Sequence, residues 1–346
     1  MSAAPFILSG CSTSPARKPV VPSTAPVALL LPITGTATEL ARAVELGASL
    51  AQTPPDGKPL QLFDTGTEPR GAAEAAAKAA RAGARVLLGP VFGSQLRAAA
   101  QAAGEAIPLI SFTNDIDARA ANAFVFGVTP SQSVSAILQY ARARGVRSVA
   151  ALAPANRWGQ QSLAAAQRVA GDIDIRVFEI GAMDAASGGS LLGALERATP
   201  AGPPDAVLLA HGGAEFLAHA NQLRSAYQLL GTSNVLDGSL ADLAGIEGSW
   251  IAAPDPERIR RFSRNFRPSQ ASTVNLSHAL GYDAVNIANR IVAASAPMRQ
   301  ALVSSPGFPG VAGAVRFRDD GSCVRELAIL NIAQGRAVAV DRRAGV

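Results

Sequence analysis

Small hydroxyl and amide side chains follow two apolar stretches of the sequence at the points where these stretches end. Val86–Leu88 is followed by a Gly-Pro pair and then Ser94, and the next apolar stretch is followed by Ser111, Thr113 and Asn114. Both stretches are typical of buried strands, and the Ala-rich segment between them is typical of a helix. Ligands of an open α/β sheet bind just beyond the carboxyl ends of its strands. We therefore expect these four polar residues to bind a small polar molecule.

The elements that must position these residues alternate between strands and helices. Strands are expected at residues 27–31, 60–64, 86–88, 108–111 and 124–126. After a break at Thr129–Ser131, where Ser131 is expected to cap a helix, strands recur at 148–152, 173–179 and 206–210. Such alternation indicates parallel strands with right-handed crossovers. The chain is therefore predicted to be an α/β protein of two similar lobes, with hinges near residues 129–131 and 253–256.

The composition limits the classes of partner. The chain has 346 residues, of which 48% are hydrophobic and 16% are charged, and this suits two globular domains. The formal net charge of +5 favours anionic partners. However, the basic residues are scattered and no nucleic-acid-binding motif accompanies them, so we expect no nucleic-acid partner.

The motifs of the common catalytic classes are absent from the sequence. It contains no Gly-x-Ser-x-Gly elbow, no His-Glu-x-x-His, no Walker phosphate loop and no dinucleotide-binding Gly-x-Gly-x-x-Gly after a strand. No His or Cys residues are spaced as metal ligands. We therefore expect a binding protein with no catalytic residue, no metal and no cofactor.

The first residues indicate that the protein is located in the cell envelope as a lipoprotein. Leu8–Cys11 resembles the lipobox of a lipoprotein, and the Ser/Pro/Ala-rich residues 12–25 suit a flexible tether. A chance match remains the alternative, because Met1–Ile7 lacks basic residues and is too short for a signal peptide of about 15–30 residues. We favour lipidation of Cys11 and a native start upstream of Met1. A disulfide between Cys11 and Cys323 is not expected.

Five short motifs occur in order between residue 26 and about residue 340. They are Leu29–Gly35, Gly89–Ser94, Pro108–Ser111, Gly281–Ala284, and Phe308–Phe317 with Asp320-Gly321 after it. Together they resemble the type 1 periplasmic binding proteins, in the Leu/Ile/Val-binding branch. The resemblance implies two Rossmann-like lobes around a central cleft, with three crossings of the chain between them. It also implies lobes formed by residues 26–131 plus 254–324 and by residues 132–253 plus 325–341, after a signal remnant at 1–11.

The resemblance assigns roles to the hydroxyl groups on the first lobe. It implies that Ser94, Ser111 and Thr113 bind the carboxylate of a ligand, with help from backbone N–H groups at helix starts. The alternative is that Ser94 and Thr113 only cap helices.

The corresponding half of the cleft on the second lobe departs from the family pattern. Trp158 stands where relatives place a Tyr over the ligand, and it either stacks on a ligand or packs at the lobe interface. His211 follows a predicted strand and either lines the cleft or is structural. We favour the structural role. The acid that binds the ligand's ammonium group in relatives has no clear match, and Asp237 is the nearest candidate. The ligand is therefore left open.

Two functions are compatible with this pattern. The first is capture of a small polar, amino-acid-like ligand between the lobes, followed by presentation to an ABC permease. The second arises because Trp250–Pro256 and the lipobox together resemble proteobacterial penicillin-binding protein activators, which implies regulatory contact with a peptidoglycan synthase. Ser12 occupies the position where Asp marks inner-membrane retention in some bacteria, so the outer membrane is favoured for the lipid anchor.

Arginines are densest just after the second predicted hinge. Residues 255–266 are expected to form an amphipathic helix whose apolar stripe is Ile259, Phe262 and Phe266. The arginines of this region are Arg258, Arg260, Arg261, Arg264 and Arg267. We expect them to form a solvated face, and the alternative is a dock for an acidic protein patch or an anionic envelope polymer.

Overall fold

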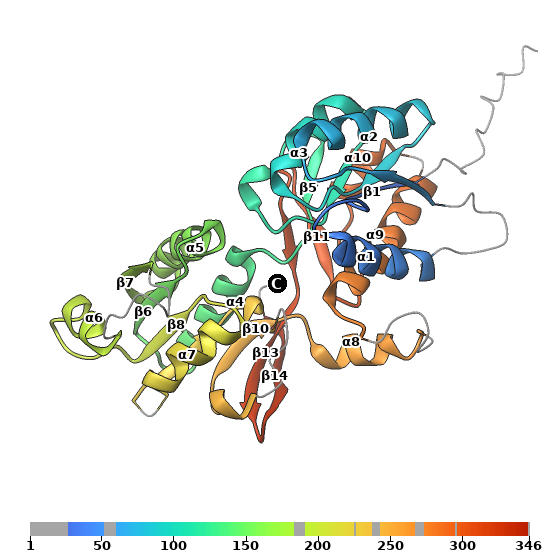
Figure 1. Cartoon of the computed structure of the whole chain (residues 1–346). Coiled ribbons are helices and arrows are strands. Elements are labelled where there is room, and N and C mark those ends of the chain that lie inside the picture. Colours follow the sequence, from blue (N-terminus) through green and yellow to red (C-terminus); the bar gives the residue numbers. More distant parts are fainter. Residues whose placement is uncertain are drawn as a thin grey trace, which may run out of the picture.

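Two lobes lie side by side, each built around its own β-sheet (Figure 1). The computed structural model describes residues 27–51, 60–182, 191–224, 226–236, 243–266, 273–294 and 296–344. Cys11, Asp237 and Arg267, which the sequence singled out, lie outside the described residues. No helix in the described ranges is both long enough and apolar enough to span a bilayer.

The sheet of the first lobe is entirely parallel, with strand order β2-β1-β3-β4-β5. Its strands are β1 (Val27–Leu31), β2 (Gln61–Asp64), β3 (Val86–Leu88), β4 (Leu109–Ser111) and β5 (Ala123–Val125). Every residue of β1, β3, β4 and β5 is buried. This burial is expected because helices cover both faces of a parallel sheet.

Alternate residues of β1 face two different layers of helices. Leu29 and Leu31 pack in one apolar core, and Ala28 and Leu30 pack in another. The first core includes α1 (Thr38–Leu50) and α9 (Leu276–Ala293), and the second includes α2 (Pro69–Arg81) and α3 (Gly93–Ala103). The short helices α8 (Pro256–Ser263) and α10 (Met298–Val303) and the hairpin of β11 (Val315–Phe317) and β12 (Cys323–Arg325) complete this lobe.

The sheet of the second lobe has the order β14-β13-β10-β9-β8-β6-β7. Its strands are β6 (Ser148–Ala153), β7 (Arg176–Ala182), β8 (Ala206–Leu209), β9 (Gln228–Gly231), β10 (Trp250–Ala253), β13 (Leu327–Ala333) and β14 (Arg336–Ala344). Strands β6 to β10 are parallel, whereas β13 is antiparallel to both β10 and β14. The helices on its two faces are α4 (Pro130–Ala143) with α5 (Arg157–Ile173), and α6 (Leu191–Ala198) with α7 (Gly213–Leu223).

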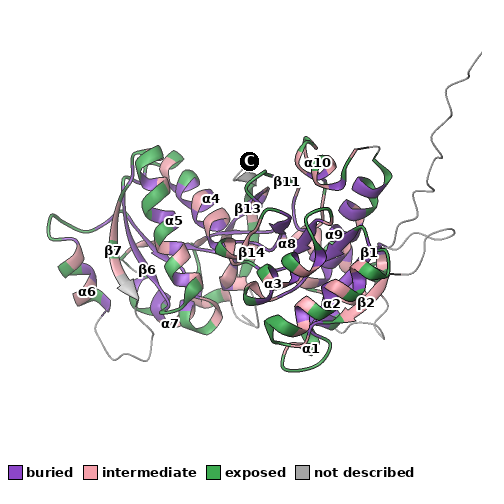
Figure 2. Ribbon diagram, turned by 90° about the horizontal axis from the view of Figure 1, so that it is seen from above, coloured by how far each residue is buried: buried purple, intermediate pink, exposed green. Residues whose placement is uncertain are grey.

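The predicted class, an α/β protein with two lobes of parallel strands, is confirmed. The chain passes between the sheets through α4, between β10 and α8, and between β12 and β13. We propose that the lobes comprise residues 26–131 with 254–324 and residues 132–253 with 325–341. Figure 2 shows the inner strands of both sheets buried beneath helices whose outer faces are exposed.

The structure differs from the sequence prediction at the first crossing. Thr129, and not Ser131, is the N-cap of α4: its hydroxyl accepts the backbone N–H of Gln132 at 3.3 Å, and the Gln132 side chain accepts the N–H of Thr129 at 3.1 Å. Pro130 explains why the cap lies two residues earlier than predicted, because its fixed φ and missing N–H suit the first helical residue. The helix therefore begins one residue before Ser131.

Candidate functional site

The hydroxyl of Ser111 joins the loops that follow β3 and β4. It donates to the carbonyl of Pro90 at 2.7 Å and accepts the backbone N–H of Thr113 at 3.3 Å, and the residue is fully buried. Gly89 lets the first loop pass close to β1, since its φ is +118° and a Cβ there would lie 2.1 Å from the carbonyl oxygen of Leu30. The Gly-Pro and Ser motifs therefore hold together the loops at the carboxyl ends of β3 and β4.

The other polar residues predicted on this lobe divide into buried and exposed groups. Thr113 is buried, and its hydroxyl accepts the backbone N–H of Asp115 at 3.1 Å. Ser94 and Asn114 are exposed. Ser94 lies in the first turn of α3, whose N-cap is Phe92, so Ser94 does not cap that helix. Of the predicted set on this lobe, only Ser94 and Asn114 present polar side chains to solvent.

A carboxylate of the chain itself lies beside the start of α3. A Cβ placed on Gly93 would lie 3.0 Å from Oδ2 of Asp115 and 3.1 Å from the hydroxyl of Thr113. An anion near a helix N-terminus is stabilised by the N–H groups that have no partner in the first turn. Asp115 therefore lies close to the place that the family resemblance assigns to a ligand carboxylate.

Asp115 and Asp117 connect the first lobe to the second. The side-chain amide of Gln161 donates to Asp115 at 2.6 Å and to Asp117 at 2.8 Å. Arg157 lies 3.3 Å from the Asp115 carboxylate and 3.5 Å from that of Asp117. Asp115 caps the 3-10 turn Ile116–Ala118, and Asp117 lies within that turn. Arg157 and Gln161 stand in the first turns of α5. We call these four residues the inter-lobe bridge.

The sequence analysis did not detect the inter-lobe bridge. Its two halves are separated by about forty residues of chain, and only the acidic pair after Asn114 and the Arg beside Trp158 hint at it. The side chain of Asp115 is 18% exposed, whereas those of Arg157 and Asp117 are 63% and 61% exposed. Solvent screens exposed ion pairs, so each contributes about 0–1 kcal/mol.

Removing the second-lobe half of the bridge is expected to open the cleft. In Arg157→Ala with Gln161→Ala, the loss of about 1–2 kcal/mol of contacts shifts the ratio of closed to open forms roughly tenfold. The radius of gyration from small-angle scattering should rise. Arg168→Ala on the same helix, exposed and outside the bridge, is the control. An unchanged radius in the double variant would show that the bridge does not hold the lobes.

Among the described residues, Trp158 and His211 are the second-lobe candidates for the cleft, and both are anchored within their own lobe. Trp158 is half-buried, and its indole N–H donates to the carbonyl of Ala210 at 3.0 Å. His211 is fully buried, and its ring lies 4.5 Å from that of His219 on α7. Trp158 therefore stands next to the inter-lobe bridge, whereas His211 belongs to the interior of the second lobe.

Asp64 fixes the loop of the first motif, Leu29–Gly35, by hydrogen bonds. It ends β2, accepts the hydroxyl of Thr34 at 2.6 Å, and accepts the backbone N–H groups of Ile33 at 3.1 Å and Gly66 at 2.9 Å. Burial acts to raise the pKa of Asp64, but these hydrogen bonds together hold it below its usual value. The Pro-Ile-Thr-Gly loop at the edge of the first sheet is therefore held by a charged carboxylate.

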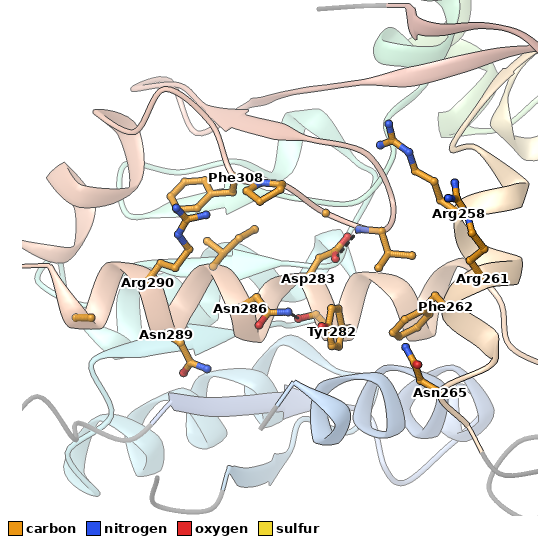
Figure 3. Close-up of a pocket in the computed structure, with 15 residues that line it drawn as sticks. Arg258, Arg261, Phe262, Asn265, Tyr282, Asp283, Asn286, Asn289, Arg290 and Phe308 are labelled. Carbon is orange, nitrogen blue, oxygen red and sulfur yellow. Dashed lines mark hydrogen bonds between the residues drawn. The ribbon is translucent and has the colours of Figure 1, made fainter. Parts of the chain in front are cut away.

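A large groove lies away from the inter-lobe bridge, on the first lobe (Figure 3). It has a volume of about 900 Å³ and runs between α8, the exposed side of α9 and the segment 308–311. We call it the lateral groove. Its polar lining residues are Arg258, Arg261, Asn265, Tyr282, Asp283, Asn286, Asn289 and Arg290. The sequence pointed to this region only through the arginines of α8.

Asp283 builds the wall of the lateral groove. Its carboxylate accepts the backbone N–H groups of Val311 at 2.8 Å and Ala312 at 2.9 Å, and a Cβ on Gly310 would lie 2.6 Å from Oδ2. Burial raises the pKa of Asp283 to about 6, against the two hydrogen bonds and the charges of Arg325 and Arg258, which lower it. The Gly-Tyr-Asp-Ala and Phe-Pro-Gly motifs are therefore two halves of one contact.

The sequence matches the model of the family described as periplasmic binding protein over residues 24–337, and the chain belongs to that family. No curated protein matches the chain at a significant level. Solved structures with the same fold cover nearly all of it.

Three such structures illustrate the range of the family. A structure assigned to a branched-chain amino acid ABC transporter of Rhodospirillum rubrum has a TM-score of 0.76 at 20% identity, covering 91% of this chain and 100% of the other. A solute-binding protein of an ABC transporter from R. palustris, in complex with benzoate, has a TM-score of 0.64 at 18% identity, covering 93% and 97%. The LpoA (YraM) C-domain from Haemophilus influenzae, described as a regulator of PBP1A, has a TM-score of 0.70 at 17% identity, covering 91% and 100%.

Proposed function

We propose that this chain is a non-catalytic, extracytoplasmic regulatory protein that acts by contacting a peptidoglycan synthase. The observation that carries the proposal is the inter-lobe bridge, in which Asp115 of one lobe is bound by Arg157 and Gln161 of the other. The lobes are thus joined by their own side chains. Lobes joined in this way suit a scaffold that presents a surface to a partner.

The use of the hydroxyl groups supports the same proposal. The hydroxyl protons of a carboxylate site must point toward the ligand, but the hydroxyl proton of Ser111 is donated to the carbonyl of Pro90. Asp115 places a negative charge beside the start of α3. A second carboxylate at this position would meet like-charge repulsion, so a free amino acid is a poor occupant in this arrangement.

The choice of partner rests on two resemblances. Trp250–Pro256 resembles the penicillin-binding protein activators. The LpoA C-domain from Haemophilus influenzae, which is described as a regulator of PBP1A, shares the fold. The test is to add the purified chain to the peptidoglycan synthases of its own host and to measure glycan polymerisation and cross-linking from a lipid-linked precursor. We expect the rate to rise. Unchanged rates with every synthase, together with no binding in the same mixture, would overturn the proposal.

Capture of a small polar ligand for an ABC permease is the second candidate. It is favoured by Trp158, a half-buried ring next to the inter-lobe bridge, and by the exposed side chains of Ser94 and Asn114. Thermal melting against amino acids and aromatic acids tests it. A ligand present at about a hundred times its Kd stabilises the folded chain by about 2.7 kcal/mol. No change across the panel would count against capture. Where a ligand does raise the melting temperature, an equal rise in Asp237→Ala would rule out the ammonium-binding role predicted for Asp237.

We propose a lipid anchor on Cys11, with residues 12–25 as the tether and the outer membrane as the site of attachment. The thiol of a lipobox cysteine receives the diacylglycerol, so labelled lipid precursor given to cells should be incorporated into the chain. Cys11→Ala should abolish the label, and Cys323→Ala, which replaces a buried thiol, should retain it. Label that persists in Cys11→Ala would show that the anchor is elsewhere.

A further inference from the structure

We propose that the lateral groove binds an extended acidic peptide segment of a partner protein. The groove would be the docking surface for the regulatory partner proposed above, so the identity of the partner rests on that proposed function. The groove is separate from the inter-lobe bridge: its walls come from α8, α9 and the segment 308–311, all on the first lobe.

The charge of the groove selects an anionic occupant. Arg258, Arg261 and Arg290 line it, whereas its one acidic lining residue, Asp283, is 2% exposed and bound to backbone N–H groups. Arg258 also forms an ion pair with Glu326 at 2.5 Å, so its charge is partly compensated. Arg261 and Arg290 are exposed and form no ion pair within the part of the chain that the structure describes.

The arginines lie at opposite ends of the groove. Figure 3 shows Arg258 and Arg261 at one end and Arg290 beside Phe308 at the other. The guanidinium of Arg290 lies 5.9 Å above the centre of the Phe308 ring, and this stacking orients it. Guanidinium groups bind carboxylates through paired, charge-assisted hydrogen bonds. The ends of the groove are therefore two carboxylate sites.

The spacing of these ends fits a short extended peptide. Tyr282, near the α8 end, and Arg290 are eight residues apart on α9, which is about 12 Å at a rise of about 1.5 Å per residue. An extended chain advances about 3.3 Å per residue. About four residues therefore span the groove, so acidic residues at positions i and i+4 would meet both ends.

The middle of the groove suits a peptide backbone. Tyr282, Asn286 and Asn289 share one face of α9 at i, i+4 and i+7, with Asn265 near the α8 end. The amide of Asn286 donates to the carbonyl of Tyr282 at 3.1 Å, which leaves its carbonyl oxygen to accept a backbone N–H. A phosphate polymer would need cations along the whole groove, whereas the middle of this one is lined by amides, rings and aliphatic groups. This pattern favours a peptide.

The test uses a labelled twelve-residue peptide with Glu at its fourth and eighth positions and neutral residues elsewhere, and a copy with Gln at both. Fluorescence anisotropy with the full chain should show binding of the Glu peptide, weakened roughly tenfold or more in Arg261→Glu and in Arg290→Glu. The affinity of the wild-type chain for the Gln peptide should be no higher than the affinity of the two variants for the Glu peptide. Both arginines are exposed, so melting temperatures should be unchanged.

Arg264→Glu is the matched control, because Arg264 is an exposed arginine that ends α8 and does not line the groove. It should leave the affinity within about twofold of the wild type. If Arg264→Glu loses as much affinity for the Glu peptide as Arg261→Glu does, or if the Gln peptide binds as tightly as the Glu peptide, the proposal is overturned. Either result would show that binding does not depend on carboxylates meeting the two ends of the groove. Tighter binding of short-chain polyphosphate that is lost in Arg261→Glu would overturn the peptide as occupant. A peptide that binds while synthase rates stay unchanged would support the groove and count against the proposed function.

Discussion

Arg325→Met is expected to lower the free energy of unfolding by about 3–5 kcal/mol, the largest loss from any single substitution proposed for this chain. Arg325 is 1% exposed and is the last residue of β12, just before the chain crosses to β13 in the other lobe. It donates to the carbonyl of Ala312 at 3.1 Å and to the carbonyl of Phe126 at 2.5 Å. Its guanidinium also lies 4.7 Å above the centre of the Phe126 ring.

Two opposing effects decide the size of this loss. Burial disfavours the charged form and lowers the pKa of Arg325, so removing the charge relieves a cost. Against this, Met leaves the carbonyls of Ala312 and Phe126 without these donors, at about 1–3 kcal/mol each, and removes the stacking on Phe126. The nearby charge of Asp283 also loses a favourable neighbour. The second set of effects is larger, so the variant is destabilised.

Urea denaturation followed by circular dichroism measures the effect. Arg70→Met is the control, because Arg70 is 89% exposed and pairs only with Glu74 one turn away, so its loss should be within about 0.5 kcal/mol. Arg325→Lys should fall between the two, since a lysine keeps the charge but cannot bridge both carbonyls in the same geometry. A midpoint for Arg325→Met equal to that of Arg70→Met would refute the role assigned to the guanidinium.

Gly281→Ala is expected to destabilise the chain by about 2–4 kcal/mol, because it separates two packed helices. A Cβ on Gly281 of α9 would lie 2.1 Å from the carbonyl oxygen of Val44 on α1, and a Cβ on Gly47 of α1 would lie 1.8 Å from that of His278 on α9. The two backbones therefore touch, and each glycine faces the main chain of the other helix. The clash outweighs the gain of about 1 kcal/mol that Ala brings to a helix interior.

Gly171→Ala is the matched control and should have the opposite sign. Gly171 also lies inside a helix, α5, but a Cβ there would meet no atom within 4 Å. The substitution should therefore stabilise the chain by about 0.5–1 kcal/mol through helix propensity and a less flexible unfolded state. If urea denaturation shows the same sign for Gly171→Ala and Gly281→Ala, close packing of α1 on α9 is not the cause.

Fold class and most element positions could be predicted from the sequence because they depend on local patterns. The apolar stretches at 27–31 and 86–88 indicated β1 and β3, and the Ala-rich segment after the second stretch indicated α3, all within a few residues. Strands β9 and β10 and helix α10 were not predicted as elements. In β9 only Leu229 and Leu230 are apolar, so no longer apolar run marks that strand. The cap of α4 was misplaced by two residues, since Pro130 moves the helix start.

The sequence by itself also determined which residue types stand at the carboxyl ends of the strands, because those types follow the apolar stretches directly. Only the tertiary structure decided what these groups do. The hydroxyl of Ser111 binds a backbone carbonyl on a neighbouring loop, and the partners of Asp115 come from a helix of the other lobe. The groove likewise combines Arg261 and Arg290 from two helices. Hydrogen bonds and ion pairs act over a few ångströms, so their pairing depends on how distant segments pack, which no local pattern contains.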